Sequence, residues 1–285
     1  MAESSNIRVA VVGASSQIGQ ALLPRLAAAG YISYCIGRES RNLVEGTTTY
    51  VFEETSRCFF PQLDSIDVVV SLAPLPSIEV VVKMAQALGA KRIIAFGSTG
   101  RFSKLGSTSI IEQDFVLQQE QAEVSFSARC KSLNIAWTLF RPTMIYGANA
   151  DQNVSFIKSM VHRFGFFPMP IGANGLRQPV HVDDLAAACI AVLGRNKGLN
   201  KAYNLGGGDI IKYSELVRRI FLAEGKSPFL LPVPKWVYRF LIQLAVKLNI
   251  APFARFEMVE RMYADLTVNN QSAVDDFGFS PKEFR

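Results

Sequence analysis

The chain has 285 residues, of which 49% are hydrophobic and 19% are charged, and its formal net charge is +6. This composition excludes a disordered chain and allows one large domain or two closely joined ones. The basic residues are scattered rather than gathered in a run, so we predict no nucleic-acid partner.

The four cysteines lie far apart and form no CxxC pair: Cys35, Cys58, Cys130 and Cys189. We therefore predict reduced buried thiols, no metal site and a cytoplasmic protein. The polar opening residues predict no signal peptide. No stretch of about 18 residues is both apolar and uncharged, which argues against a membrane span.

The first half of the chain alternates short apolar runs with patterns of helical spacing. Residues 7–13 form an apolar run that ends in glycine, as a buried parallel strand does, and residues 16–30 have apolar side chains at helical spacing. Further strands are expected over 31–37, 48–53, 67–73, 92–98 and 135–142, and helices over 78–90 and 112–134. Parallel strands need crossover helices, so this succession predicts an α/β fold with a doubly wound parallel sheet.

After Pro142 the pattern changes. Residues 144–153 and 164–179 are rich in glycine, proline and asparagine and are expected to be loops. A helix capped by Asp183 or Asp184 is expected over 181–194, and a short strand over 201–207. We predict a sheet domain formed by residues 1–146, with 177–205 returning to it. Residues 147–176 and 206–285 are predicted to form a smaller substrate-side lobe.

The segment GASSQIG, residues 13–19, lies between the first expected strand and the first expected helix. Two glycines six residues apart in this position let the backbone approach a pyrophosphate and aim helix N–H groups at it. An ordinary tight turn is the alternative. Ser16 stands where such turns usually have glycine, and a positive φ there would cost roughly 1 kcal/mol. The predicted cofactor contacts are Gly13, Ser15, Ser16, Gln17, Ile18 and Gly19.

The second expected strand ends in YCIGRES, which lacks the acidic residue that would bond the ribose hydroxyls of NAD. Arg38 could instead bind the 2′-phosphate of NADP, and a solvated loop arginine is the alternative. NAD and NADP therefore both stay open as cofactors.

Five segments occur in the order VVGASSQIG, DVVVSLAP, RIIAFGSTG, LFRPTMIYG and RQPVHVDDLA. Together they resemble the extended short-chain dehydrogenase/reductase family and, more narrowly, its NAD(P)-dependent nucleotide-sugar epimerases and dehydratases. The likeness runs over nearly the whole chain, to AVDDFGFSP near its end. It implies a Rossmann-like, dinucleotide-binding sheet domain with a smaller C-terminal substrate lobe, a nucleotide-linked sugar as ligand and, by analogy, a homodimer.

The resemblance also implies site residues. The cofactor would cross the 13–19 turn, pass Leu72 and Ala73, and lie near Pro142 and Thr143. Arg177 would meet a nucleotide diphosphate, because an arginine presents paired N–H donors to phosphate oxygens. A loop arginine bonded to backbone carbonyls is the alternative.

The family's YxxxK pair, which carries its acid–base chemistry, is missing. Matching Ala122–Glu123 to the family's pattern puts Phe115 at the tyrosine position and Gln119 at the lysine position. No tyrosine occurs between Tyr50 and Tyr146, and none of the eight tyrosines has a lysine four residues later. Gln119 could still bond a ribose hydroxyl. Of the family's catalytic set, only Ser98 and Thr99 remain, and a hydroxyl without an activating base is a poor proton acceptor.

Three interpretations therefore stay open. A nucleotide-sugar enzyme could use Asp114, Glu112, Glu120 or a water as its base. A catalytically silent protein could bind NAD(P) or a sugar nucleotide as a sensor or complex subunit. A reductase could rely on proton transfer assisted by its substrate.

A basic stripe marks residues 235–247, where a lysine, arginine or glutamine recurs every fourth position beside a broad apolar surface: Lys235, Arg239, Gln243 and Lys247. A helix packed on the substrate lobe or a dimer partner is the ordinary interpretation. Peripheral contact with an anionic membrane is the alternative.

Overall fold

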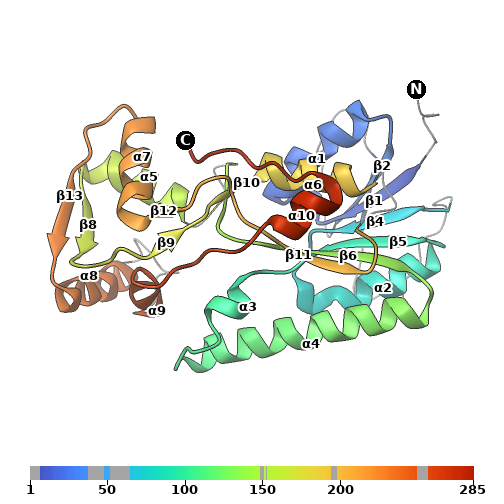
Figure 1. Cartoon of the computed structure of the whole chain (residues 1–285), viewed down its shortest axis with the longest axis horizontal. Coiled ribbons are helices and arrows are strands. Elements are labelled where there is room, and N and C mark those ends of the chain that lie inside the picture. Colours follow the sequence, from blue (N-terminus) through green and yellow to red (C-terminus); the bar gives the residue numbers. More distant parts are fainter. Residues whose placement is uncertain are drawn as a thin grey trace.

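A seven-stranded parallel sheet forms the centre of the computed structural model, which describes residues 7–37, 48–51, 65–147, 151, 153–193, 198–248 and 256–285. The strand order is β11–β6–β5–β4–β1–β2–β3 (Figure 1). The strands are β1 (Arg8–Val12), β2 (Ile32–Gly37), β3 (Thr48–Val51), β4 (Val68–Ser71), β5 (Arg92–Phe96), β6 (Ala136–Pro142) and β11 (Lys201–Leu205). The predicted doubly wound parallel sheet is confirmed.

Helices cover both faces of this sheet (Figure 1). On one face lie α1 (Gln17–Ala28) and α6 (Val182–Leu193); on the other lie η1 (Leu75–Ser77), α2 (Ile78–Ala87) and α4 (Ile110–Ser132). Successive strand residues point to opposite faces, so Val9 and Val11 pack in the core under α1 while Ala10 packs under α2. This double burial explains why the strands read as continuous apolar runs.

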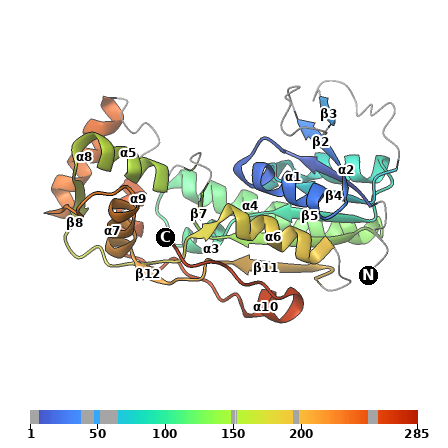
Figure 2. The same ribbon diagram turned by 90° about the horizontal axis from the view of Figure 1, so that it is seen from above.

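A smaller lobe lies at one end of the molecule, beyond the carboxyl ends of the strands (Figures 1 and 2). It contains α5 (Val154–Phe164), β8 (Phe167–Pro170), α7 (Tyr213–Ala223), β13 (Leu230–Val233), α8 (Lys235–Lys247) and α9 (Phe256–Arg261). These elements share a separate apolar core, in which Ile157, Phe167, Leu216 and Phe221 are buried.

The loops expected over 144–153 and 164–179 were wrong in part. Short strands occur there as β7 (Ile145–Tyr146), β8 and β9 (Leu176–Arg177). They pair with β10 (Val180–His181), β13 and β12 (Ile211–Lys212), respectively. Strands of two to four residues form because a partner from another part of the chain lies alongside, which glycine and proline content does not reveal.

Two details refine the predicted organisation. The helix α10 (Gln271–Phe277) falls within the range predicted for the smaller lobe, yet Ala273 and Phe277 pack in the core under α1 and α6. The predicted domain division stays a prediction. The expected aspartate cap of α6 was wrong: the His181 Nδ1 accepts the backbone N–H of Asp183 at 3.1 Å. Within the described residues, every helix is too short or too polar to cross a lipid bilayer.

An ion-pair cluster ties α5 to the end of α7. Glu224 contacts Lys158 Nζ at 3.0 Å and His162 Nε2 at 2.5 Å. The hydrogen bonds from Lys158 and then His162 lower the pKa of Glu224 below its usual 4.5.

We expect Glu224→Gln to reduce the free energy of unfolding by about 0.5–1 kcal/mol at pH 7, because near-surface ion pairs contribute about that much. A carboxylate with a lowered folded-state pKa stabilises the fold above its unfolded pKa and loses this effect as pH falls through the folded value. The difference from the parent should therefore shrink below about pH 4. Urea unfolding at pH 7 and pH 3.5 measures it; an equal difference at both values would contradict the assignment.

Candidate functional site

The 13–19 turn lies where the strand order reverses. From β1 the chain continues to its neighbour β2 on one side, whereas its other neighbour, β4, follows only after β3. In doubly wound sheets, ligands bind outside the carboxyl ends of the strands at such a switch point. The Gly13 N–H donates to the Ile36 carbonyl at 3.0 Å, and the Leu72 N–H donates to the Val12 carbonyl at 2.9 Å. The turn is thus joined to the ends of both neighbouring strands.

Both the backbone conformation of Gly13 and the space around it require glycine. Its φ is +75°, in the left-handed region that L side chains rarely adopt. A Cβ at this position would lie 3.2 Å from the Leu72 carbonyl carbon and 3.3 Å from the Ala73 nitrogen. Leu72 and Ala73, which were predicted from the resemblance, therefore lie directly against the turn.

Ser16 carries no backbone strain, so the possible penalty for replacing glycine does not apply. Its φ is −66° and its ψ is 159°, and it caps α1: its Oγ accepts the Gly19 N–H at 3.2 Å. Gly19 is needed for close packing, because a Cβ there would lie 2.2 Å from the Ala14 carbonyl oxygen. The first turn of α1 contains no acidic residue that would oppose an anion.

The other predicted contacts of this turn differ in their surroundings. Ser15 is exposed, whereas the Ile18 side chain is buried in the core and can offer a ligand only its backbone. The Gln17 Oε1 is buried and has no hydrogen-bond partner among the described residues. Arg38 lies outside the described residues, so the structure carries no information on the predicted 2′-phosphate contact.

The predicted reacting end follows β5. The Ser98 Oγ accepts the Gly100 N–H at 3.0 Å, and the Thr99 Oγ1 donates to the Pro142 carbonyl at 3.0 Å. The Thr143 Oγ1 likewise donates to the Gln178 carbonyl. The Ser98 hydroxyl therefore already bonds its own loop, and the Thr99 hydroxyl bonds the end of β6.

Phe115 lies beside Ser98, with Gly100 between them. A Cβ on Gly100 would lie 3.0 Å from the Ser98 Oγ and 3.2 Å from Cε1 of the Phe115 ring. The Lys104 ammonium lies 4.1 Å from the centroid of that ring, a cation–π contact. The position aligned with the family's tyrosine thus lies on the same side of Gly100 as the retained serine hydroxyl, but its ring has no proton to exchange.

Gln119 lies one turn further along α4, facing the end of β5. It is buried, and its Oε1 has no hydrogen-bond partner among the residues that the structure describes. A Cβ on Gly97 would lie 3.7 Å from this oxygen and 3.5 Å from the Glu123 Oε1. Because buried polar atoms are nearly always bonded, this unpartnered amide oxygen is an exception among the described residues.

Glu123 joins two arginines and was not predicted as a site residue. It is buried, bonds Arg141 through Nε at 2.9 Å and Nη2 at 2.5 Å, and also contacts Arg101. This triad joins α4 to the end of β6, through Arg141, and to the short helix α3 (Gly100–Ser103), through Arg101. An acid four residues after Gln119 was the available signal, but only the fold brings Arg101 and Arg141 to it.

The three carboxylates proposed as replacement bases all have partners. Glu112 is buried and pairs with Arg261, with Lys104 at 3.7 Å. Asp114 is exposed and accepts a hydrogen bond from Gln118 at 2.8 Å, and half-exposed Glu120 lies 3.2 Å from Arg101. The cations beside Glu112 and Glu120 favour the charged carboxylate and so make each a weaker base.

The surroundings of Arg177 match the alternative interpretation, an arginine bonded to backbone carbonyls. It is 3% exposed, and its guanidinium donates to three backbone carbonyls: Leu176 at 2.8 Å, Ala264 at 2.9 Å and Arg261 at 2.6 Å. Burial lowers the pKa of Arg177 to about 10, so it stays charged at neutral pH. Its predicted contact with a nucleotide diphosphate stays a prediction.

Two curated relatives share part of this sequence. The chain is 24% identical over 174 residues to the UDP-glucose 4-epimerase of Vibrio cholerae, covering 60% of this chain and 50% of that protein. It is 27% identical over 172 residues to GDP-L-fucose synthase 1 of Arabidopsis thaliana, covering 51% and 53%, respectively. The chain thus spans about half the length of these relatives.

Solved structures extend the likeness of fold to nearly the whole chain. The UDP-glucose 4-epimerase of Thermotoga maritima superposes with a TM-score of 0.69 at 15% identity, covering 97% of this chain and 94% of that one. The UDP-glucuronic acid 4-epimerase of Bacillus cereus gives 0.72 at 13% identity, covering 98% and 94%. The model of the NAD dependent epimerase/dehydratase family matches residues 9–206, more than half of the chain. The chain therefore belongs to the NAD dependent epimerase/dehydratase family.

Proposed function

We propose that the chain binds NAD(P) with the pyrophosphate against the 13–19 turn and the start of α1. The main observation behind this proposal is Gly13. Its positive φ and its close approach to Leu72 and Ala73 require a residue without a side chain, so a ligand can approach the backbone at the switch point of the sheet. N–H groups at the start of α1 favour an anion there. The unpartnered Gln119 oxygen supports a bound ribose hydroxyl near the end of β5.

The second ligand that we propose is a nucleotide-linked sugar, bound on the side of the smaller lobe. This rests on the family, and on the Thermotoga maritima relative being described with UDP-glucose and the Bacillus cereus relative with NAD. A bound NAD(P) supplies the hydride acceptor of such a reaction. Ser98 and Thr99 would line the reacting end, and Asp114, Glu112, Glu120 or a water would handle the proton.

A catalytically silent NAD(P)- or sugar-nucleotide-binding protein is the second candidate. It is favoured by Phe115, which cannot transfer a proton, and by the existing partners of Glu112, Asp114 and Glu120. A silent protein that binds NAD(P) requires the same cofactor site as the enzyme and differs from it only in turnover, whereas one that binds only a sugar nucleotide does not require that site. The homodimer expected by analogy stays part of the proposal, and light scattering after gel filtration measures it.

Titration with NADH and with NADPH, followed by nicotinamide fluorescence, tests the cofactor site. Saturation with either form should also raise the melting temperature by about 5 °C at a hundredfold excess over Kd. Absence of both signals would reject the proposal. The ratio of the two affinities decides between NAD and NADP.

A panel of nucleotide sugars then separates the two candidates. If the chain is an enzyme, incubation with NAD(P)+ should give epimerised or dehydrated product, or incubation with NAD(P)H should give reduced product. Turnover lost in Glu120→Gln or Asp114→Asn identifies the base, and turnover kept in both rejects these two residues. Cofactor binding without any product favours the silent binding protein.

A further inference from the structure

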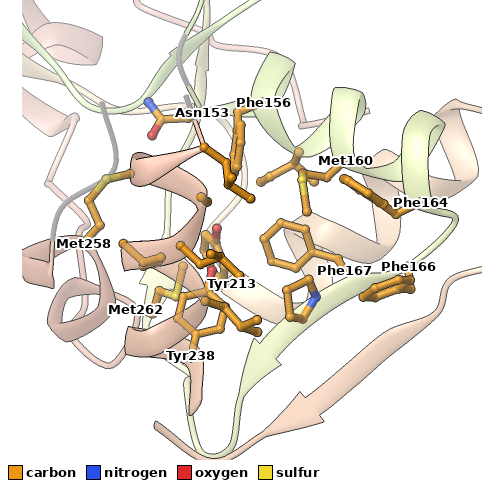
Figure 3. Close-up of a pocket in the computed structure, with 17 residues that line it drawn as sticks. Asn153, Phe156, Met160, Phe164, Phe166, Phe167, Tyr213, Tyr238, Met258 and Met262 are labelled. Carbon is orange, nitrogen blue, oxygen red and sulfur yellow. The ribbon is translucent and has the colours of Figure 1, made fainter. Parts of the chain in front are cut away.

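An apolar pocket lies in the smaller lobe, between α5, β8, α7, α8 and α9 (Figure 3). Its volume is about 340 Å³, within the range of small-molecule sites. Of its 17 lining residues, only Asn153, Tyr213 and Tyr238 have polar side-chain atoms other than sulfur. Phe156 and Phe167 line it together with methionines, which adapt to irregular ligands: Met160, Met258 and Met262.

This pocket is separate from the proposed cofactor site. None of its lining residues belongs to the 13–19 turn or to the Ser98–Thr99 segment. Burial raises the pKa of Tyr213 to about 12 and raises that of Tyr238 well above 10, so both phenols are neutral at physiological pH. The pocket therefore offers its occupant no charge, which excludes a phosphate or a sugar acid inside it.

Exposed apolar side chains follow one another along α8 and Leu248, and some of them line the pocket. Trp236, Phe240, Leu244 and Leu248 recur every fourth residue, and Trp236 and Phe240 are 74% and 61% exposed. Leu244 and Leu248 also line the pocket. Among the described residues of α8, only Tyr238 is buried. Helix packing thus leaves most of the apolar surface of α8 uncovered.

Positive charge lies beside this apolar surface. Lys235 and Arg239 share one acidic partner, Glu260, at 2.6 Å and 2.5 Å. Lys247, next to Leu248, has no acidic partner within the part of the chain that the structure describes. The Arg163 guanidinium lies 5.3 Å from the ring of Phe164, which also lines the pocket. Two basic residues thus adjoin lining residues of the pocket, Lys247 beside Leu248 and Arg163 beside Phe164.

We propose that this pocket binds the hydrocarbon chain of an anionic amphiphile, with the charged head outside near Lys247 and Arg163. A neutral, apolar interior with a cationic edge matches that chemistry. A water molecule takes up about 30 Å³, and a methylene group is of similar size. The pocket volume of about 340 Å³ therefore holds roughly ten to twelve carbon atoms of a chain. The amphiphile is either a free fatty acid or a lipid whose chain leaves a bilayer. The apolar and basic stripes side by side on α8 suit contact with a bilayer surface.

The chain-length dependence of fatty-acid binding tests the pocket in the unmodified protein. Displacement of 11-(dansylamino)undecanoate by saturated fatty acids of 6 to 16 carbons, each below its micelle concentration, gives their affinities. We expect affinity to rise about fourfold per methylene and to level off near ten to twelve carbons. An affinity independent of chain length, or no displaceable fluorescence, would overturn the proposal.

A matched pair of α8 variants locates the site. Ala245 lines the pocket, whereas Gln243 is exposed on the same helix and does not. Ala245→Trp should weaken the probe at least tenfold, and Gln243→Trp should leave its affinity within twofold. Equal affinities for the two variants, both with parental circular dichroism, would place binding elsewhere and overturn the assignment.

Vesicles distinguish the two sources of the chain. The protein is sedimented with phosphatidylcholine vesicles that contain phosphatidylglycerol. If it sediments with them, and if Ala245→Trp reduces the sedimented fraction, the chain comes from a bilayer lipid. Binding of monomeric fatty acid without sedimentation indicates a free amphiphile. If dodecanol binds as tightly as dodecanoate, and Lys247→Gln changes neither, the anionic head is refuted.

Discussion

Gly13→Val is expected to weaken NADH and NADPH binding at least hundredfold, equivalent to about 2.7 kcal/mol. The valine side chain has to fit against the Leu72 carbonyl carbon, 3.2 Å from the Cβ, and would stand where a pyrophosphate approaches the backbone. The positive φ adds strain of roughly 1–2 kcal/mol to the folded state. Nicotinamide fluorescence titration measures the affinity and thermal unfolding the stability.

Gly30 provides a matched control at the other end of α1. Its φ is +80°, so valine there meets similar backbone strain, but a Cβ would have nothing within 4 Å. Gly30→Val should therefore lose stability and keep parental cofactor affinity. If Gly13→Val folds and binds either cofactor as tightly as the parent, the proposed site is wrong. Gly13→Ala repeats the test with a smaller side chain should the valine variant fail to fold.

The double variant Phe115→Tyr with Gln119→Lys is expected to raise turnover of a bound nucleotide sugar by 10²–10⁴-fold, the usual contribution of a positioned acid–base group. Phe115 already lies beside Ser98, and Lys104 lies 4.1 Å from the ring centroid, where it would help to lower the pKa of a tyrosine. A lysine at 119 would have the Glu123 carboxylate nearby to offset its burial. Product formation by the panel assay is the measurement.

The single variants separate the two contributions. Phe115→Tyr alone should recover part of the gain, because Lys104 supplies one cation, whereas Gln119→Lys alone should recover none. A double variant that binds cofactor and nucleotide sugar yet stays inactive would contradict the view that only the proton-transferring groups have been lost. The defect would then lie in the geometry of the cleft.

The strands of the sheet could be predicted because each is buried on both faces and so reads as a continuous apolar run. Residues 7–13, 67–73 and 92–98 match β1, β4 and β5 to within two residues. The short strands β8 and β9 could not be predicted, because their stability comes from β13 and β12, more than 30 residues away in the chain. Local composition there indicates a loop, and pairing overrides it.

For the candidate site, too, local features could be predicted and features that depend on distant residues could not. The glycine turn is local, so its position between a strand and a helix was readable, although the extended conformation of Ser16 was not. The surroundings of Arg177 and Glu123 depend on partners at positions 261 and 264, and at 101 and 141. Sequence spacing cannot indicate whether an arginine faces a ligand or a backbone carbonyl.

By itself, the sequence determined the parallel sheet, the glycine turn and the absence of the tyrosine–lysine pair, because each depends on residues close together in the chain or on residue identity. Only the tertiary structure decided that Phe115 and Ser98 both lie against Gly100, that Gln119 keeps an unpartnered oxygen, and that α8 borders an apolar pocket. These features arise where elements distant in sequence pack together. The physical reason is that burial and hydrogen-bond satisfaction are properties of neighbours in space.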